Sequence, residues 1–193
     1  RASLNENSTG DNNVAVGRNA LLANSTADNN TAVGYSSLTA NTTGTNGVAI
    51  GFQASLSNTT GGQNTSLGWN AFGTNTTGSD NTALGKRALH ASTTASNNTA
   101  VGANSLLLNT TGLQNTAVGA LSLDANTTGS YNTALGEKSL STNILGSKST
   151  AVGTFSLFNQ NPASAVDMYN VAVGYDAGNA VTTGVQNTLI GGL

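Results

Sequence analysis

Few residues of this chain could carry out covalent chemistry, and they do not converge. The only histidine, His90, has no Ser-His-Asp set or G-x-S-x-G motif around it. Apart from Asp11 and Asp28, the acidic residues share no repeat position, so they predict neither a catalytic carboxylate pair nor a calcium ladder. Without Cys, the chain has no disulfide, thiol catalyst or cysteine zinc site. We therefore expect no enzyme activity and no metal or cofactor.

Aromatic residues are the better candidates for ligand recognition. Tyr35, Phe52 and Trp69 recur every 17 residues, and Lys86 takes the next position at that spacing. If successive turns stack, these side chains form an aromatic ladder that ends in a cation. Aromatic faces bind sugar rings and partner side chains, and a cation adds a cation–π contact. The alternative is structural, with the rings covering an edge of the fold or filling a seam between chains.

A second candidate lies in the segment 159–169, which holds the only Pro and the only Met of the chain. Its polar and aromatic residues Asn161, Asp167 and Tyr169 could contact a ligand, because loops that project from a rigid scaffold often carry function. The alternative is a tolerated insertion whose apolar residues fold back onto the scaffold.

The element that must position these residues is a repeat. Its consensus is N-T-A-V-G-x-x-A-L-x-x-N-T-T-G-x-x, and one expanded turn, 154–173, lengthens a single interval to 21 residues. The anchor glycines of the repeat are Gly17, Gly34, Gly51, Gly68, Gly85, Gly102, Gly119, Gly136, Gly153, Gly174 and Gly191. The array starts and stops within a repeat, which indicates one segment, 1–193, of a longer fibre protein.

This repeat predicts a parallel β-solenoid of about eleven coils. Seventeen residues are too few for a helix pair, and Asn, Thr and Gly disfavour helix interiors. In the segment T-A-V, Thr and Val point to one face and Ala to the other. We expect the Val-type column before each Gly to form the core, supported by the Leu column four residues after each Gly.

The Ala column on the opposite face predicts an assembly. On a face open to solvent, polar residues would be expected at many of these positions. Nine Ala in eleven turns therefore suggest that this face is buried against the same column of another chain, as in a parallel homotrimer. The alternative is that a tight coil leaves room only for a methyl group.

At the corners of the coil, Gly allows strained turns, and stacked Asn amides hydrogen-bond from coil to coil. The ten N-x-[ST] sequons follow from this turn chemistry and are weak evidence for glycosylation.

The run N-x-A-[VI]-G-x-x-[AS], as in segments 30–34 and 47–51, resembles the YadA-like head repeats of trimeric autotransporter adhesins. The longer form with N-T-T-G is similar to repeats of phage tail fibres and of trimeric fibre proteins of predatory bacteria. The resemblance covers almost the whole chain, although the coils here are three residues longer than those of YadA-like heads. It implies a left-handed β-roll, trimeric and extracellular, on a bacterial cell surface or a phage tail fibre.

We therefore expect an adhesin or receptor-binding fibre segment whose ligand is a host, prey or matrix surface group such as a carbohydrate. The net charge of −2 and six scattered basic residues give no reason to expect nucleic acid as a partner, and no apolar run is long enough to insert into a membrane. One alternative is a shaft or spacer without a ligand. A Thr column also leaves an ice-binding solenoid open, and a polysaccharide-cleaving β-helix would need a carboxylate cluster that the sequence lacks.

Overall fold

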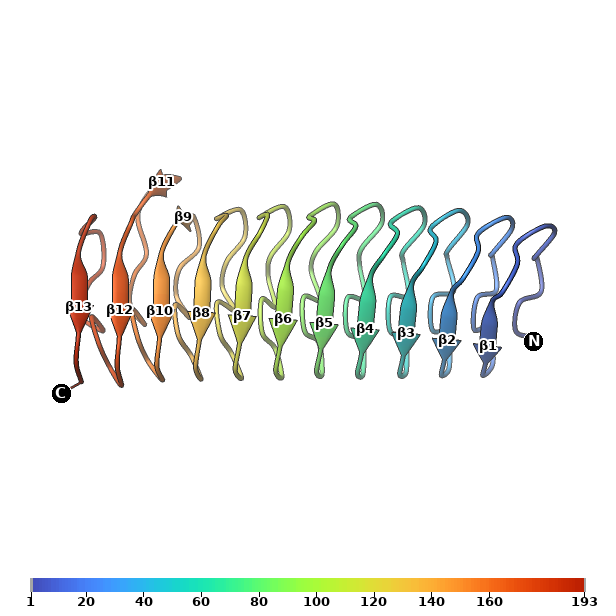
Figure 1. The fold of residues 1–193 in the computed structure, drawn as a ribbon, viewed down its shortest axis with the longest axis horizontal. Helices are drawn as coiled ribbons and strands as arrows, with labels where there is room; N and C mark the ends of the chain where they lie inside the picture. Colours follow the sequence, from blue (N-terminus) through green and yellow to red (C-terminus); the bar gives the residue numbers. More distant parts are fainter. Residues whose placement is uncertain (1, 193) are drawn as a thin grey trace.

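The computed structural model describes residues 2–192 as an elongated all-β rod in which the described residues form no helix (Figure 1). Eleven short strands stack in one parallel sheet, one strand from each coil. These strands are β1 (Val14–Val16), β2 (Thr31–Val33), β3 (Val48–Ile50), β4 (Thr65–Leu67), β5 (Thr82–Leu84), β6 (Thr99–Val101), β7 (Thr116–Val118), β8 (Thr133–Leu135), β10 (Thr150–Val152), β12 (Val171–Val173) and β13 (Thr188–Ile190). The parallel β-solenoid with its 17-residue repeat is therefore confirmed.

The strands pair in strict register, so each repeat position forms a column along the rod. Ala32 pairs with Ala15 and Ala49, for example, in the neighbouring strands β1 and β3. The expanded coil adds a second, two-stranded sheet in which β11 (Val166–Asp167) pairs with β9 (Gly146–Ser147). This pair projects from the edge of the rod at which the main strands begin (Figure 1).

Left-handed backbone at fixed positions makes each coil turn. The anchor Gly has a φ of 131° at Gly102, and a Cβ there would lie 2.6 Å from the carbonyl group of Gly119 in the next coil. Three other positions in each repeat also have positive φ without being Gly, as at Asn29 (59°), Ser36 (53°) and Leu38 (50°). Each such residue costs about 1–3 kcal/mol, so packing between coils must hold these corners in place.

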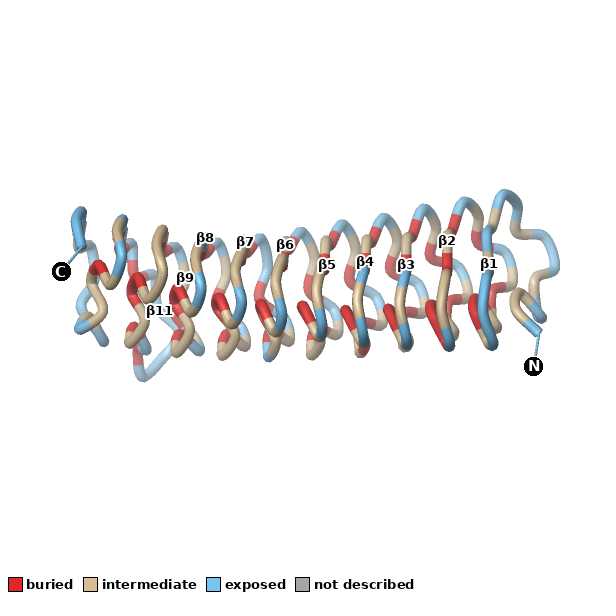
Figure 2. Tube along the Cα trace, turned by 90° about the horizontal axis from the view of Figure 1, so that it is seen from below, coloured by how far each residue is buried: buried red, intermediate tan, exposed pale blue. Residues whose placement is uncertain are grey.

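The core is the reverse of the expected one. From β2 to β12 the Ala residues of the strands are fully buried, whereas the Val-type column faces outward and includes Val16, 57% exposed, and Leu67, 46% exposed. Buried residues recur in successive coils along the rod (Figure 2). The prediction of a Val core was wrong, and so was the assignment of the Ala face to a contact between chains. The alternative explanation of the Ala column holds, because the narrow coil leaves room for small side chains at that position, Ala in most coils and Ser66 in one.

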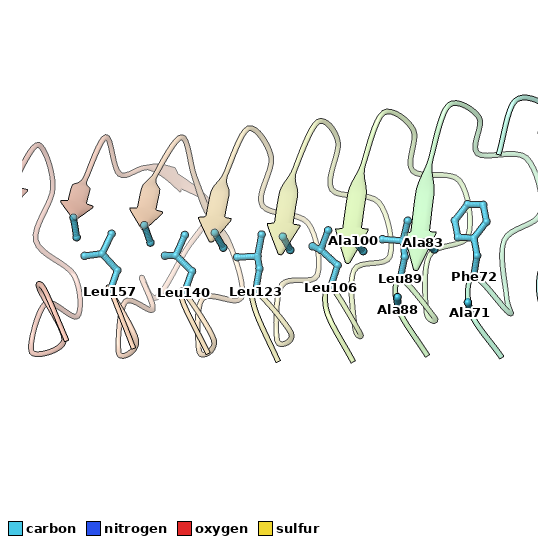
Figure 3. Packing of buried hydrophobic residues seen from close by; sticks show 14 of the residues in the cluster. Ala71, Phe72, Ala83, Ala88, Leu89, Ala100, Leu106, Leu123, Leu140 and Leu157 are labelled. Atoms are coloured by element: carbon cyan, nitrogen blue, oxygen red, sulfur yellow. The ribbon is translucent and has the colours of Figure 1, made fainter. Parts of the chain in front are cut away.

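The expected Leu column is confirmed as the main apolar filling of the coil. Each Leu projects from the corner after the strand toward the inward Ala column, as Leu106 and Leu123 do in Figure 3. A column of Ala or Ser beside it is buried as well. Its serines satisfy their hydroxyl groups locally, as Ser105 does by donating to the carbonyl oxygen of Gly102 at 3.0 Å.

One polar pair interrupts this apolar column. Ser55 replaces the Leu of its coil and Ser66 replaces the Ala of the next, and their buried hydroxyl oxygens lie 2.8 Å apart. Phe72, in the coil after Ser55, is fully buried, and its larger side chain offsets the volume that Ser55 leaves. The buried apolar residues accordingly form two clusters, one on each side of this Ser55–Ser66 seam.

The Asn ladders are confirmed. The amide nitrogen of Asn41 donates to the Asn24 side-chain oxygen at 3.0 Å and to the Gly44 carbonyl at 2.9 Å, and Asn58 donates to Asn41 in turn. Asn30 has the same kind of role at the other corner, where it accepts a hydrogen bond from the Gly47 backbone. Asn41 is fully buried, which agrees with a structural origin for its sequon.

Candidate functional site

The predicted aromatic ladder forms at the corner that follows each strand. Tyr35, Phe52 and Trp69 occupy the position after the anchor Gly in three successive coils, and Tyr35 stacks on Phe52 with ring centroids 5.3 Å apart and planes 12° apart. The ammonium group of Lys86 lies 5.6 Å from the Trp69 ring centroid, as the sequence predicted. All three rings are 41–47% exposed.

A second cation at the other end of the ladder was missed. The Arg18 guanidinium lies 5.9 Å from the Tyr35 ring centroid, so a cation covers each end of the row. Arg18 stands at the same repeat position as Tyr35, one coil earlier. Extending the aromatic column by one coil toward the N-terminus would therefore have predicted this contact from the sequence. Together, Arg18, Tyr35, Phe52, Trp69 and Lys86 form what we call the aromatic row.

Cations and a neighbouring ring occupy several of the ring faces in the row. Tyr35 has Arg18 on one face and Phe52 on the other, and Lys86 lies over Trp69. An aromatic ring is negative on its face and positive at its edge. The exposed rim of the row thus combines two full cations with the positive edges of stacked rings.

The expanded coil brings together only some of its candidates. Asp167 accepts a hydrogen bond from the Lys148 ammonium at 2.8 Å, and the same ammonium donates to the Tyr169 hydroxyl at 3.1 Å. These contacts raise the pKa of Lys148, with the Asp167 hydrogen bond as the largest cause. Asn161 has a different role, because its backbone N–H donates to the carbonyl of Thr182.

The structural interpretation of this loop holds in part, and its ligand contacts stay a prediction. Pro162 and Met168 fold back and are buried, whereas residues 163–167 are exposed. The cluster of Lys148, Asp167 and Tyr169 belongs to the edge where the strands begin, and the aromatic row follows the opposite strand ends (Figure 1). The structure therefore divides the predicted site residues between two separate places.

Another aromatic cluster lies farther along the same edge as the row. The Lys138 ammonium is 5.5 Å from the Phe155 ring centroid, and Phe155 packs edge-to-face with both Phe158 and Tyr175. Tyr175 is 62% exposed. Tyr175 directly follows its anchor Gly, as the rings of the aromatic row do, but Lys138 and Phe155 stand two residues after theirs, so the column of the row includes only Tyr175 of this group.

His90 and Asp124 share one repeat position, two coils apart, and neither has a catalytic partner. Burial lowers the pKa of His90, and the nearby Arg87 adds to this effect. Burial also raises the pKa of Asp124, although a hydrogen bond from the Ser141 hydroxyl opposes the shift. Both shifts arise from partial burial against the coil.

Within residues 2–192, no group of three or more His, Cys, Asp or Glu side chains is placed to hold a metal ion. The same residues contain no helix long and apolar enough to cross a membrane. Compared with known proteins, the chain matches no family model, no curated protein and no solved structure. The resemblance to YadA-like heads thus depends on the repeat motif alone.

Proposed function

We propose that this chain is a segment of an extracellular attachment fibre and that its aromatic row binds a ligand on a cell surface. The supporting observation is the row itself, in which three exposed aromatic rings occupy the same position of successive coils and two of them, Tyr35 and Phe52, stack. Such side chains on a preformed scaffold bind at low entropic cost. The alternative of a plain shaft or spacer would need no such row, although its rings could also protect the edge of the rod.

A glycan array tests this function. We expect the chain to bind surface glycans and the Trp69→Ala variant to bind at least about fivefold more weakly, because exposed aromatic anchors often dominate binding. Tyr131→Ala is the matched control, since Tyr131 is 53% exposed at a different corner of the repeat. Shortening the loop 159–169 tests the second site. If none of these proteins binds a glycan, the result supports a spacer without a ligand.

The homotrimer is also part of the proposal, now through the outward face of the main sheet. The Val-type and Thr columns run along this face for the length of the rod, and Leu135 (45% exposed) and Val173 (38%) are among its open apolar side chains. Monomeric soluble proteins rarely expose a continuous apolar patch of more than a few hundred Å². A second and third copy of the same column would cover it.

Light scattering tests the assembly. We expect a mass about three times the 19.1 kDa of one chain. The double variant Val118→Lys, Leu135→Lys should give the single-chain mass, because it places charges within the apolar contact. Thr111→Lys is the control, since Thr111 is exposed at another corner. A single-chain mass for the unchanged protein would contradict the trimer.

The outward Thr and Val columns also favour ice binding as a second candidate. Both point outward from one sheet in register, as the pairing of β6 with β7 illustrates. Val14, Val48 and Val171 interrupt the Thr column, however. The face can serve ice or a partner chain but not both, and a trimer without thermal hysteresis would exclude the ice-binding function.

A further inference from the structure

The charges of the first five coils are segregated along the rod. We define the cationic edge by the side chains of Arg18, Tyr35, Phe52, Trp69, Lys86 and Arg87. It contains every Lys and Arg between residues 2 and 137 and no acidic residue. The acidic residues of these coils, Glu6, Asp11, Asp28 and Asp80, occupy other repeat positions, and the last three precede the strands that the cationic edge follows. A strand of three residues, about 10 Å long, separates the two edges.

The cationic edge is extended and regular. Arg18 and Lys86 are four coils apart, which is about 19 Å at the usual spacing of parallel strands. Backbone hydrogen bonds between adjacent coils, such as that from Gln53 to the carbonyl of Tyr35 at 2.9 Å, hold successive corners in line. A ligand that contacts the whole edge must therefore be a linear chain rather than a compact small molecule.

The occupied ring faces decide which chemistry fits. Neutral sugars pack their C–H groups on the negative faces of aromatic rings, and nucleic-acid bases stack on those same faces. Here Tyr35 is covered on both faces and Trp69 carries Lys86. Arg18 and Lys86 are exposed, and these cations and the positive ring edges both attract anionic oxygen atoms, so an anionic ligand fits the row better than a neutral one.

We propose that the cationic edge binds a linear anionic polysaccharide through its carboxylate or sulfate groups. Arg18 and Lys86 pair with anionic groups at the two ends of the row, and the ring edges of Tyr35 and Phe52 line the path between them. Arg87, half-buried beside Lys86, adds to the positive potential at that end. This inference depends on the proposed attachment function and names the class of its ligand.

Binding of the 193-residue chain to immobilised polygalacturonate, dextran sulfate and neutral dextran tests the proposal, with single-stranded poly-dT as a further probe. We expect binding to the two anionic polysaccharides and none to neutral dextran. The affinity should fall about tenfold between about 50 and 200 mM salt, because the contacts are charge pairs that release counterions.

Two lysines provide a matched pair of variants. Lys86 and Lys148 each lie over an aromatic ring, Trp69 and Tyr169 respectively, but Lys148 is on the other edge. Lys86→Gln should weaken binding about threefold, whereas Lys148→Gln should not change it. The triple variant Arg18→Gln, Lys86→Gln, Arg87→Gln should weaken it about tenfold or more.

Equal losses in the two lysine variants would show that only net charge matters and would overturn the proposal. Tighter binding to poly-dT than to either anionic polysaccharide would overturn it in favour of nucleic acid. Failure to bind any anionic probe, together with Trp69-dependent binding of neutral glycans on the array, would refute this inference and leave the attachment function intact.

Discussion

A Gly102→Ala variant is expected to lose about 3 kcal/mol of unfolding free energy. Two effects add. The φ of 131° is one that side-chain-bearing residues rarely adopt, and the new Cβ would lie 2.6 Å from the backbone of Gly119. Because that neighbour is backbone rather than a flexible side chain, the two coils must separate to make room. Urea denaturation followed by circular dichroism measures the loss.

Gly191→Ala separates these two effects. Gly191 has a similar φ of 123°, but a Cβ there would meet nothing within 4 Å. Its substitution should therefore cost only the conformational strain and should be clearly milder. If the two variants lose equal stability, close approach between coils is not what requires Gly at this position.

Leu106→Ala is expected to cost about 2–5 kcal/mol, the usual range for a fully buried Leu. Leu106 lies between Leu89 and Leu123 in the apolar column and faces inward Ala side chains such as Ala100 (Figure 3). The narrow coil offers no other large side chain that could move into the space. The substitution should shift the denaturation midpoint without changing the spectrum of the folded rod.

Leu108→Ala is the control for this variant. Leu108 lies in the same coil but is 47% exposed, so its loss should cost less than about 0.5 kcal/mol. Equal costs at the two positions would mean that the Leu106 column is not the main apolar filling of the solenoid.

The repeat length and the turn residues were enough to predict the parallel stack, the Asn ladders and the aromatic row. Each of these follows from column geometry, because residues 17 positions apart must lie side by side once coils stack. Tyr35 and Phe52 stack for this reason, and Asn41 bonds to Asn24 for the same one.

The inside and outside of the strand could not be predicted in the same way. A strand of three residues alternates faces, but alternation does not say which face the chain curls around. Side-chain size suggested that Val faces the interior. Ala faces it instead, because Leu residues such as Leu38 already fill the interior from the corner that follows the strand. Because the Ala face is buried inside the coil, the proposed contact between chains moves to the outward face that carries the Thr and Val columns.

The loop cluster followed only in part from the columns. Lys148 and Tyr169 each stand five residues before an anchor Gly, so the 21-residue interval places them in one column, whereas the contact of Lys148 with Asp167 spans 19 residues and lies outside it. The backbone of that coil, with Pro162 and Met168 turned inward, decides which side chains meet. The spacing of the repeat therefore encodes the contact between Lys148 and Tyr169 but not the contact between Lys148 and Asp167.

The Ser55–Ser66 seam bears on how the rod responds to mechanical load. A buried hydroxyl pair replaces the Leu and Ala packing that joins the other coils, so the least cohesive junction lies near these residues. An attachment fibre under tension would yield there first. The stacked rings of Tyr35 and Phe52 lie on one side of that junction, and the Trp69–Lys86 pair lies on the other. A chain-like ligand lying along them would brace the rod at the point where it is weakest.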